Sequence, residues 1–410
     1  MASPVSVLVR NRDIRCLLVA QMVMFGGDWF VLIPLLTILP DLTGGGFFGG
    51  LVLAVDTGAV ALVLPYAGTI ADRFDRRRIM LVANLTSVVA VLTLFLVRTA
   101  STAWIALVAV GIMAMAKAFY TPAASAAVPN LVDPEDLAAT NAVSGSMWGT
   151  MLVVGSSLGG LMAQWVGPYP CFGIAAGCLA LAAGLLLLVR RSTQAPQRAA
   201  RAAARPFAEV AEAVRHIVQR PNLLSLVTVK LAVSLGNGVL AAFPLIASVV
   251  FGLGPAGTGL LFAARGLGAV IGPVLLRRVL TRPGWLLPGL AVSMAGYGLA
   301  YIAVGLAPWF ALALPLVALA HVAGGGNWAM SNYALQVVVP DGLRGRVFAT
   351  DVMLASLAVS LSQLGVGALV DQVSIRLLVV ASGALTLAYA VGWRLVTRHV
   401  MRYRSDITLL

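Results

Sequence analysis

The stretch Gly68-Thr-Ile-Ala-Asp72-Arg73-Phe-Asp75-Arg76-Arg77-Arg78 is a short charged interruption in an apolar part of the chain. Apolar runs flank it on both sides, at about 47–71 and 78–98. Each run is long enough to cross a bilayer as a helix, which takes about 20 apolar residues. The stretch therefore predicts a tight loop between two membrane-spanning helices.

The same alternation of apolar runs and short polar breaks continues through all 410 residues. Hydrophobic residues make up 60% of the chain and charged residues 10%, a composition that cannot cover a water-soluble surface. We therefore expect an all-α membrane protein with two six-helix halves, at 1–190 and 221–410, joined by a linker at 191–220. The expected spans are 14–39, 47–71, 78–98, 103–129, 138–165, 169–189, 222–250, 255–277, 284–306, 309–334, 347–370 and 375–396.

The linker begins with an arginine-rich stretch and ends in an amphipathic one. Its residues Phe207, Val210, Val214, Ile217 and Val218 share one helical face. This pattern predicts a helix that lies on the membrane surface.

The net charge of +13 comes mostly from arginine, and the arginines gather in alternate loops, in the linker and in the C-terminal tail. With the N-terminus in the cytoplasm, only Arg98 and Arg376 lie near span ends on the other side. The positive-inside rule then places both termini in the cytoplasm of a cell-membrane protein. The basic loops are expected to contact anionic lipid headgroups, and their position disfavours a nucleic-acid partner.

The two halves share a loop pattern. Val132-Asp-Pro-Glu-Asp-Leu137 and Val338-Val-Pro-Asp-Gly-Leu343 each follow a fourth span and precede a fifth, at an offset of 206 residues. An offset of about half the chain predicts a parallel structural repeat. We expect two pseudo-symmetric bundles of six helices.

Ionisable residues inside spans mark candidate sites, because a charge in the bilayer core costs at least about 2.5–3.5 kcal/mol on insertion scales. They are Asp28, Asp56, Lys117, Lys230, Arg265, His321 and Asp351. None lies inside the third span of a three-helix unit, the span that is expected to face lipid. Their distribution therefore predicts a water-accessible central path.

Asp28 and Lys117 both fall near mid-depth, so we expect them to pair. The pair is open to two interpretations, a static salt bridge or a role in handling substrate or protons. Asp28 is our first choice for the proton-coupling carboxylate. Asp56 is either a functional carboxylate or a neutral, hydrogen-bonded packing residue, since burial disfavours its charged form.

The other three basic residues inside spans have different expected roles. Lys230 is near the cytoplasmic face and is expected to snorkel towards it. Arg265 is too deep to snorkel, which predicts an anionic partner or an anionic substrate group. His321 is either a proton carrier or a hydrogen-bonded packing residue.

The loop that opens this section resembles the G-x-x-x-D-R-x-x-R-R signature of the major facilitator superfamily, in the position where that family carries it. The resemblance implies a major facilitator fold and a conformational latch between this loop and the start of span 11. The latch residues implied here are Gly68, Asp72, Arg73, Arg76, Arg77, Arg346 and Asp351. The alternative is that these arginines serve membrane topology alone.

Three further stretches resemble the branch of drug and siderophore exporters that includes macrolide efflux pumps and enterobactin exporters. They are Gly27-Asp28-Trp29, Phe119-Tyr-Thr-Pro122 followed by Pro129, and Leu343-Arg-Gly-Arg-Val-Phe348. This resemblance implies proton-driven export. Antiporters of the family often carry Gly-Pro-x-x-Gly-Gly in span 5, whereas this chain has Gly155-Ser-Ser-Leu-Gly159-Gly160, without the proline.

We expect a monomeric secondary transporter that works by alternating access, needs no bound cofactor or metal, and draws on the proton gradient. An apolar and aromatic cavity suits an amphipathic drug, antibiotic or siderophore-like metabolite. Its expected lining is Met24, Trp29, Phe119, Trp148, Asn237, Asn327, Trp328 and Asn332. The alternatives are an importer or lipid-moving carrier of the same fold, and an intramembrane transferase, which the absence of catalytic motifs disfavours.

Overall fold

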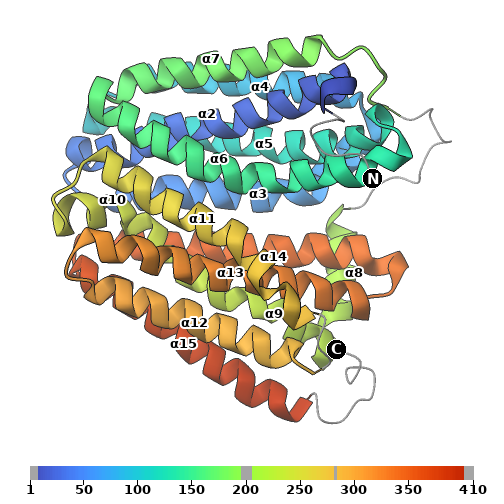
Figure 1. The fold of residues 1–410 in the computed structure, drawn as a ribbon. Helices are drawn as coiled ribbons and strands as arrows, with labels where there is room; N and C mark the ends of the chain where they lie inside the picture. Colours follow the sequence, from blue (N-terminus) through green and yellow to red (C-terminus); the bar gives the residue numbers. More distant parts are fainter. Residues whose placement is uncertain (1–7, 195–205, 281–283, 401–410) are drawn as a thin grey trace.

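The computed structural model describes residues 8–194, 206–280 and 284–400, and it leaves out some side chains within them, that of Asp72 among these. Throughout the described ranges the regular structure is helical, without a strand. Twelve of the helical spans are long and apolar enough to cross a membrane (Figure 1). The chain is therefore an all-α, multi-pass membrane protein, because a helix satisfies its own backbone hydrogen bonds in lipid.

The first six spans are formed by α2 (Arg12–Thr43), α3 (Phe47–Arg73), α4 (Arg76–Thr93), α5 (Trp104–Leu131), α6 (Leu137–Val166) and α7 (Pro168–Leu187). The seventh begins with α9 (Pro221–Gly236) and the other five are α11 (Pro255–Leu280), α12 (Leu286–Leu306), α13 (Phe310–Val338), α14 (Asp341–Leu369) and α15 (Ile375–Val400). Between the two sets lies α8 (Pro206–Val218), the helix expected from the amphipathic linker.

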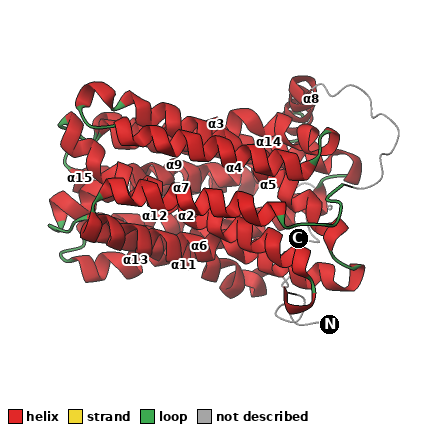
Figure 2. Ribbon diagram, turned by 90° about the horizontal axis from the view of Figure 1, so that it is seen from above, coloured by secondary structure: helices red, strands yellow, loops and turns green. Residues whose placement is uncertain are grey.

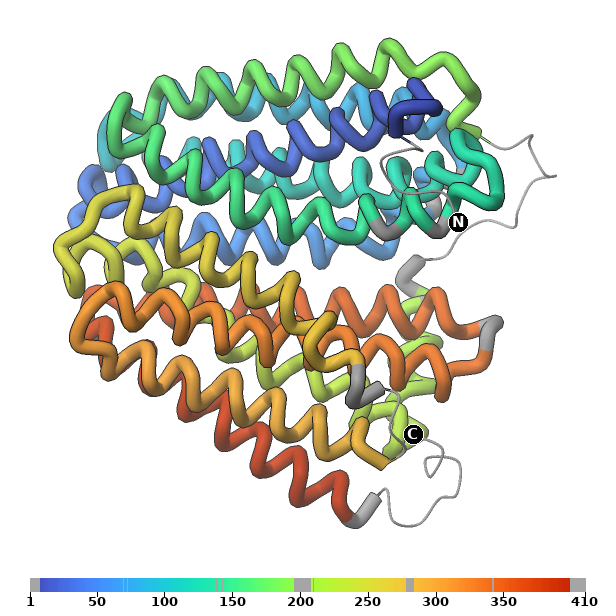
Figure 3. Tube along the Cα trace, in the orientation of Figure 1, coloured from blue at the N-terminus to red at the C-terminus, as the bar shows by residue number. Residues whose placement is uncertain are grey.

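The spans form two six-helix bundles. In the first, α2 packs against α6 and α7, and α5 packs against α3 and α4. In the second, α12 packs against α13 and α15, and α9 packs against α13, α14 and α15. The blue-to-green and yellow-to-red halves of the trace separate accordingly (Figure 3). This arrangement confirms the predicted two-bundle fold.

The bundle has two distinct ends. The end at which α2 begins, where α8 also lies and α15 ends, is called the terminal face here, and the opposite end is called the far face (Figure 2). Helix α8 packs against α14 and α9 of the second half and also contacts α3 of the first. The linker helix therefore touches both halves at the terminal face.

The two halves meet closely through glycines on α3, α6, α11 and α14. A Cβ atom at Gly50 would lie only 2.6 Å from the Cα of Gly367, and one at Gly160 only 3.0 Å from the Cα of Gly259. Such distances leave no space for any side chain, so these helices pack backbone against backbone. Small residues permit this close packing in membranes.

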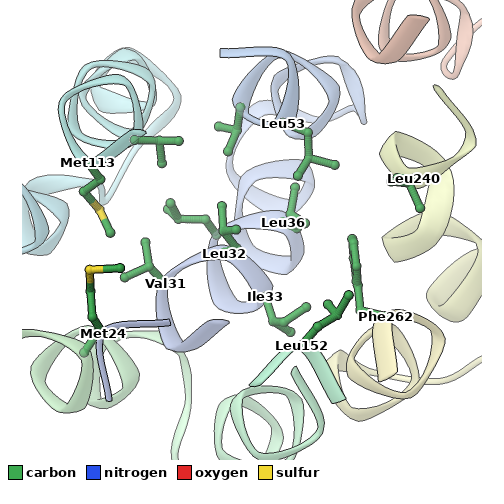
Figure 4. Close-up of a cluster of buried hydrophobic side chains, with 14 of the residues drawn as sticks. Met24, Val31, Leu32, Ile33, Leu36, Leu53, Met113, Leu152, Leu240 and Phe262 are labelled. Atoms are coloured by element: carbon green, nitrogen blue, oxygen red, sulfur yellow. The ribbon is translucent and has the colours of Figure 1, made fainter. Parts of the chain in front are cut away.

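A cluster of buried apolar side chains fills the interface next to these glycines. Figure 4 shows Ile33 and Leu36 of α2 between Leu53 of α3 and the second-half residues Leu240 and Phe262. All five side chains are buried. The interface between the halves is therefore sealed by apolar packing on the far-face side of the middle of α2.

Towards the terminal face the same helices diverge (Figure 3). A Cβ atom at Gly68 of α3, or at Gly145 of α6, would meet no heavy atom within 4 Å. The halves are thus packed together at the far face and splayed apart at the terminal face.

A carboxylate adds a polar contact to the far-face closure. Asp371, just after α14, accepts hydrogen bonds from the backbone N–H groups of Gly46 (2.7 Å) and Phe47 (3.3 Å) at the start of α3. A Cβ atom at Gly45 would lie 2.6 Å from this carboxylate, so glycine leaves room for it. Asp371 of the second half therefore caps a helix of the first half, where a negative charge is also favoured by the helix dipole.

Replacing Asp371 by alanine removes this cap, which is worth about 1 kcal/mol for a helix N-terminus. We expect the small fraction of molecules with an open far face to rise about fivefold. The readout is the rate of maleimide labelling of a cysteine at Ala54, which is buried beside α14. The background lacks the native Cys16, Cys171 and Cys178.

Gln372→Ala is the matched control, because the Gln372 side chain bonds the Ala368 carbonyl within its own half. Labelling should be unchanged in that variant. An unchanged rate in Asp371→Ala would mean that apolar packing alone keeps the far face closed.

Candidate functional site

Three charged side chains meet in the first half. The Lys117 ammonium on α5 lies 2.9 Å from the Asp28 carboxylate on α2 and 3.6 Å from the Asp56 carboxylate on α3. The predicted pairing of Asp28 with Lys117 is confirmed. The sequence did not indicate that Asp56 shares the same lysine.

The Asp28, Lys117 and Asp56 triad is partly accessible. The side chains are 13%, 25% and 22% exposed, respectively. With all three groups charged, two carboxylates face one ammonium, which leaves a net charge of −1 inside the bundle. One proton would neutralise this cluster and leave Lys117 paired with the other carboxylate.

Glycines allow the triad helices to pack closely against each other and against their neighbours α6 and α7. A Cβ atom at Gly27 would lie 3.1 Å from Cβ of Cys178 on α7, and one at Gly111 would lie 3.3 Å from the side chain of Val55 on α3. A Cβ atom at Gly159 would lie 2.7 Å from the Trp29 carbonyl oxygen. Gly155 and Gly159 therefore allow α6 to pack closely against α2, whereas Gly160 faces α11.

The second half contributes a polar aromatic cluster. The Tyr301 hydroxyl lies 2.8 Å from Nε2 of His321, and the Tyr297 hydroxyl donates to Oδ1 of Asn237 at 3.1 Å. The His321 ring contacts both tyrosine rings edge to face. His321 is thus a buried, hydrogen-bonded residue at the centre of this cluster.

Asn237 begins an irregular part of the seventh span. After α9 the chain continues as a 3₁₀ segment (Asn237–Ala242), a single α turn, α10 (Phe243–Leu245), and a π turn (Ile246–Val250). The span lies where the sequence predicted it, but it is not one regular helix. A Cβ atom at Gly238 would lie 2.7 Å from the Ser362 carbonyl oxygen, so α14 packs directly against this backbone. Mid-span 3₁₀ segments often mark hinges.

Lys230 does not snorkel. Its ammonium pairs with Asp351 of α14 and donates to Oδ1 of Asn332 at 2.7 Å. It also lies 4.8 Å from the centre of the Trp328 ring. Lys230 and Asp351 have no exposed side-chain surface. The snorkelling expectation was wrong because partners on two neighbouring helices satisfy the charge inside the bundle.

The remaining predicted lining residues occupy varied positions. Trp29 is half-buried and its ring lies 5.3 Å from that of Phe262, across the interface between the halves. The centre of the Trp148 ring lies 5.7 Å from Cζ of Arg265. Met24 is buried and Phe119 is half-buried, whereas Asn327 is fully buried and donates to Ser293.

The predicted latch residues separate into two groups. Arg76 donates to the Ala126 carbonyl (2.7 Å), and Arg77 to the Leu186 carbonyl (2.9 Å), which ties the start of α4 to the last turns of α5 and α7. Arg346 pairs with Glu212 of α8 at 2.8 Å. Cationic side chains often satisfy the free carbonyls at helix C-termini. The spacing of residues in the loop could not identify these carbonyls as the partners of Arg76 and Arg77.

Of the other latch residues, three lie in the last turns of α3 and Asp351 lies in the N-terminal half of α14. Arg73 is exposed and Gly68 is uncrowded at the terminal face, whereas Asp351 is buried with Lys230. The Asp72 side chain lies outside the described residues. The latch itself stays a prediction.

Two helical bundles that are packed together at one end, with ion-paired charges inside each bundle, have the architecture of a membrane carrier. The profile of the Major Facilitator Superfamily matches residues 17–349, and the chain belongs to this family. It is therefore a transporter and not an enzyme, since its relatives are transporters too.

Two relatives span most of the chain. The uncharacterized MFS-type transporter YfiS of Bacillus subtilis is 24% identical over 402 residues, covering 93% of this chain and 92% of that protein. The enterobactin exporter EntS of Citrobacter koseri is 25% identical over 304 residues, covering 73% and 71%. These identities are consistent with the exporter-like branch indicated by the sequence.

Solved transporters share the fold at low identity. A POT family transporter in complex with 5-aminolevulinic acid aligns with a TM-score of 0.77 at 10% identity, over 95% of this chain and 97% of that one. The nucleoside transporter NupG aligns with a TM-score of 0.72 at 13% identity, over 95% and 99%. At this level of identity the likeness establishes the fold alone.

The buried pair of Lys230 and Asp351 predicts a specific stability pattern. Lys230→Met leaves the Asp351 carboxylate buried without its counterion, which costs about 3–5 kcal/mol in comparable pairs. The double variant Lys230→Met with Asp351→Leu should recover most of that loss. Thermal unfolding of the purified protein in detergent measures both, and a single variant as stable as the wild type would contradict the pairing.

Proposed function

We propose that this transporter exports an amphipathic small molecule from the cytoplasm and is driven by the proton gradient. The observation that carries the proposal is the triad, in which Lys117 is shared by Asp28 and Asp56 at 2.9 and 3.6 Å. A charge cluster one proton short of neutrality suits reversible protonation. The similarity to an enterobactin exporter favours the outward direction.

In the proposed cycle Asp28 takes up the coupling proton. Its protonation leaves Lys117 paired with Asp56 alone, and the cluster becomes neutral. A neutral cluster moves through the closed, desolvated state at lower cost than a charged one. The empty carrier therefore resets with the proton bound, and loading of substrate accompanies its release.

We assign the terminal face to the cytoplasm, because the described arginine-rich loops and α8 lie there. The closed far face and the splayed terminal face then correspond to a carrier open towards the cytoplasm. Rocking of the two bundles about the triad exposes the site to the other side. We further propose a monomer in the cell membrane whose basic loops contact anionic lipid.

The test is efflux by Asp28→Asn in a host that lacks its own pumps. The screen uses fluorescent amphipathic dyes and antibiotics, and proton movement is followed in inverted membrane vesicles. We expect proton-linked efflux to fall at least about a hundredfold, the lower end of the usual scale for loss of a proton-transfer group, with unchanged expression and thermal unfolding.

Asp41→Asn is the matched control, because Asp41 lies on the same helix but is exposed near the far face. That variant should retain efflux. Undiminished efflux by Asp28→Asn would remove Asp28 from the mechanism. Accumulation of a compound inside expressing cells would instead indicate import.

A further inference from the structure

Arg265 is an intramembrane charge to which the described residues supply no counterion. Lys117 and Lys230 each contact at least one carboxylate, whereas Arg265 makes no ion pair or hydrogen bond with any described residue. Its Nε atom is buried without a hydrogen-bond partner. A guanidinium without a counterion inside a membrane bundle is costly, and such residues mark ligand or ion pathways.

The side chain faces the junction of the two halves. Arg265 belongs to α11, and its Cζ atom lies 5.7 Å from the centre of the Trp148 ring on α6. A Cβ atom at the adjacent Gly266 would lie 2.8 Å from Cγ of Leu152, so α11 and α6 pack closely here. Asp56 of the first half interacts with the Arg265 charge at longer range, but its ion pair is with Lys117.

Aromatic surface adjoins the guanidinium. Trp148 is 48% exposed although it lies in the middle of α6. Phe262, about one turn before Arg265 on α11, packs against Trp29 of α2 with ring centres 5.3 Å apart. A cationic fork therefore lies beside the exposed indole surface of Trp148, a combination suited to an organic ligand with an acidic group and an apolar body.

We propose that Arg265 binds a carboxylate or sulfonate group of an amphipathic substrate, whose aromatic part lies against Trp148. The planar guanidinium presents paired N–H donors that match an oxyanion, and the indole ring offers a stacking surface. The inference rests on the proposed export function and names its substrate class. It also fits the energetics, since a negative cell interior favours the exit of an anion.

The probes for the test are 2-naphthoate and its neutral analogue 2-naphthamide, which share ring and shape. Equilibrium dialysis against the purified full-length protein in detergent measures their binding. We expect the acid to bind at least tenfold more tightly than the amide. Arg265→Gln should abolish this preference while keeping the weak binding of the amide, which shows that the variant is folded, and Arg265→Lys should keep part of it.

Arg98→Gln is the matched control, because Arg98 also lies over an aromatic ring, that of Tyr169 at 3.5 Å, but on the far-face side of the first half. That variant should bind both probes as the wild type does. Equal binding of the two probes, a failure of both to bind, or an unchanged preference in Arg265→Gln would overturn the proposal.

Dialysis involves no proton gradient, so the two proposals can fail separately. If Asp28→Asn exports normally while the preference for the acid depends on Arg265, proton coupling is wrong and the anion site stands. If Arg265→Gln still prefers the acid while Asp28→Asn loses efflux, the anion site is wrong and the proton coupling stands.

Discussion

The contact of Lys117 with Asp28 and Asp56 is the interaction on which the arrangement of the first half depends. Charges inside a membrane bundle need partners, and these three come from α5, α2 and α3. The contact therefore holds three helices in one register. Because one ammonium serves two carboxylates, the same contact that binds the helices leaves room for one proton.

The interface between the halves is of another kind. It is made of glycine backbones, apolar side chains and the Asp371 cap, with few strong polar contacts between helix interiors. Within the second half, by contrast, Lys230 and Asp351 form a pair without exposed surface. Ion pairs hold helices together within each half, whereas the junction between the halves depends on packing, which in the proposed cycle opens at one end and closes at the other.

Much of this fold could be predicted from the sequence, because apolar run length and arginine placement are local signals. The pairing of Asp28 with Lys117 followed from their similar depth. Depth alone could not identify Asp56 as a second partner, nor Asp351 as the counterion of Lys230, since helix rotation decides which side chains meet. The irregular backbone after Gly236 depends on contacts with α14 that spacing along one span does not reveal.

The central claim is that the proton on Asp28 governs the balance between the two ends of the carrier. Electron-spin distance measurements in nanodiscs test it directly, with one label pair at Glu135 and Pro340 on the terminal face and another at Ser101 and Gln372 on the far face. In the wild type, the ratio of the two conformations should change between acidic and alkaline buffer. With asparagine at position 28, the acidic ratio should persist in both buffers. A conformational ratio that does not change with pH in the wild type, or that still changes with pH in Asp28→Asn, would contradict the account.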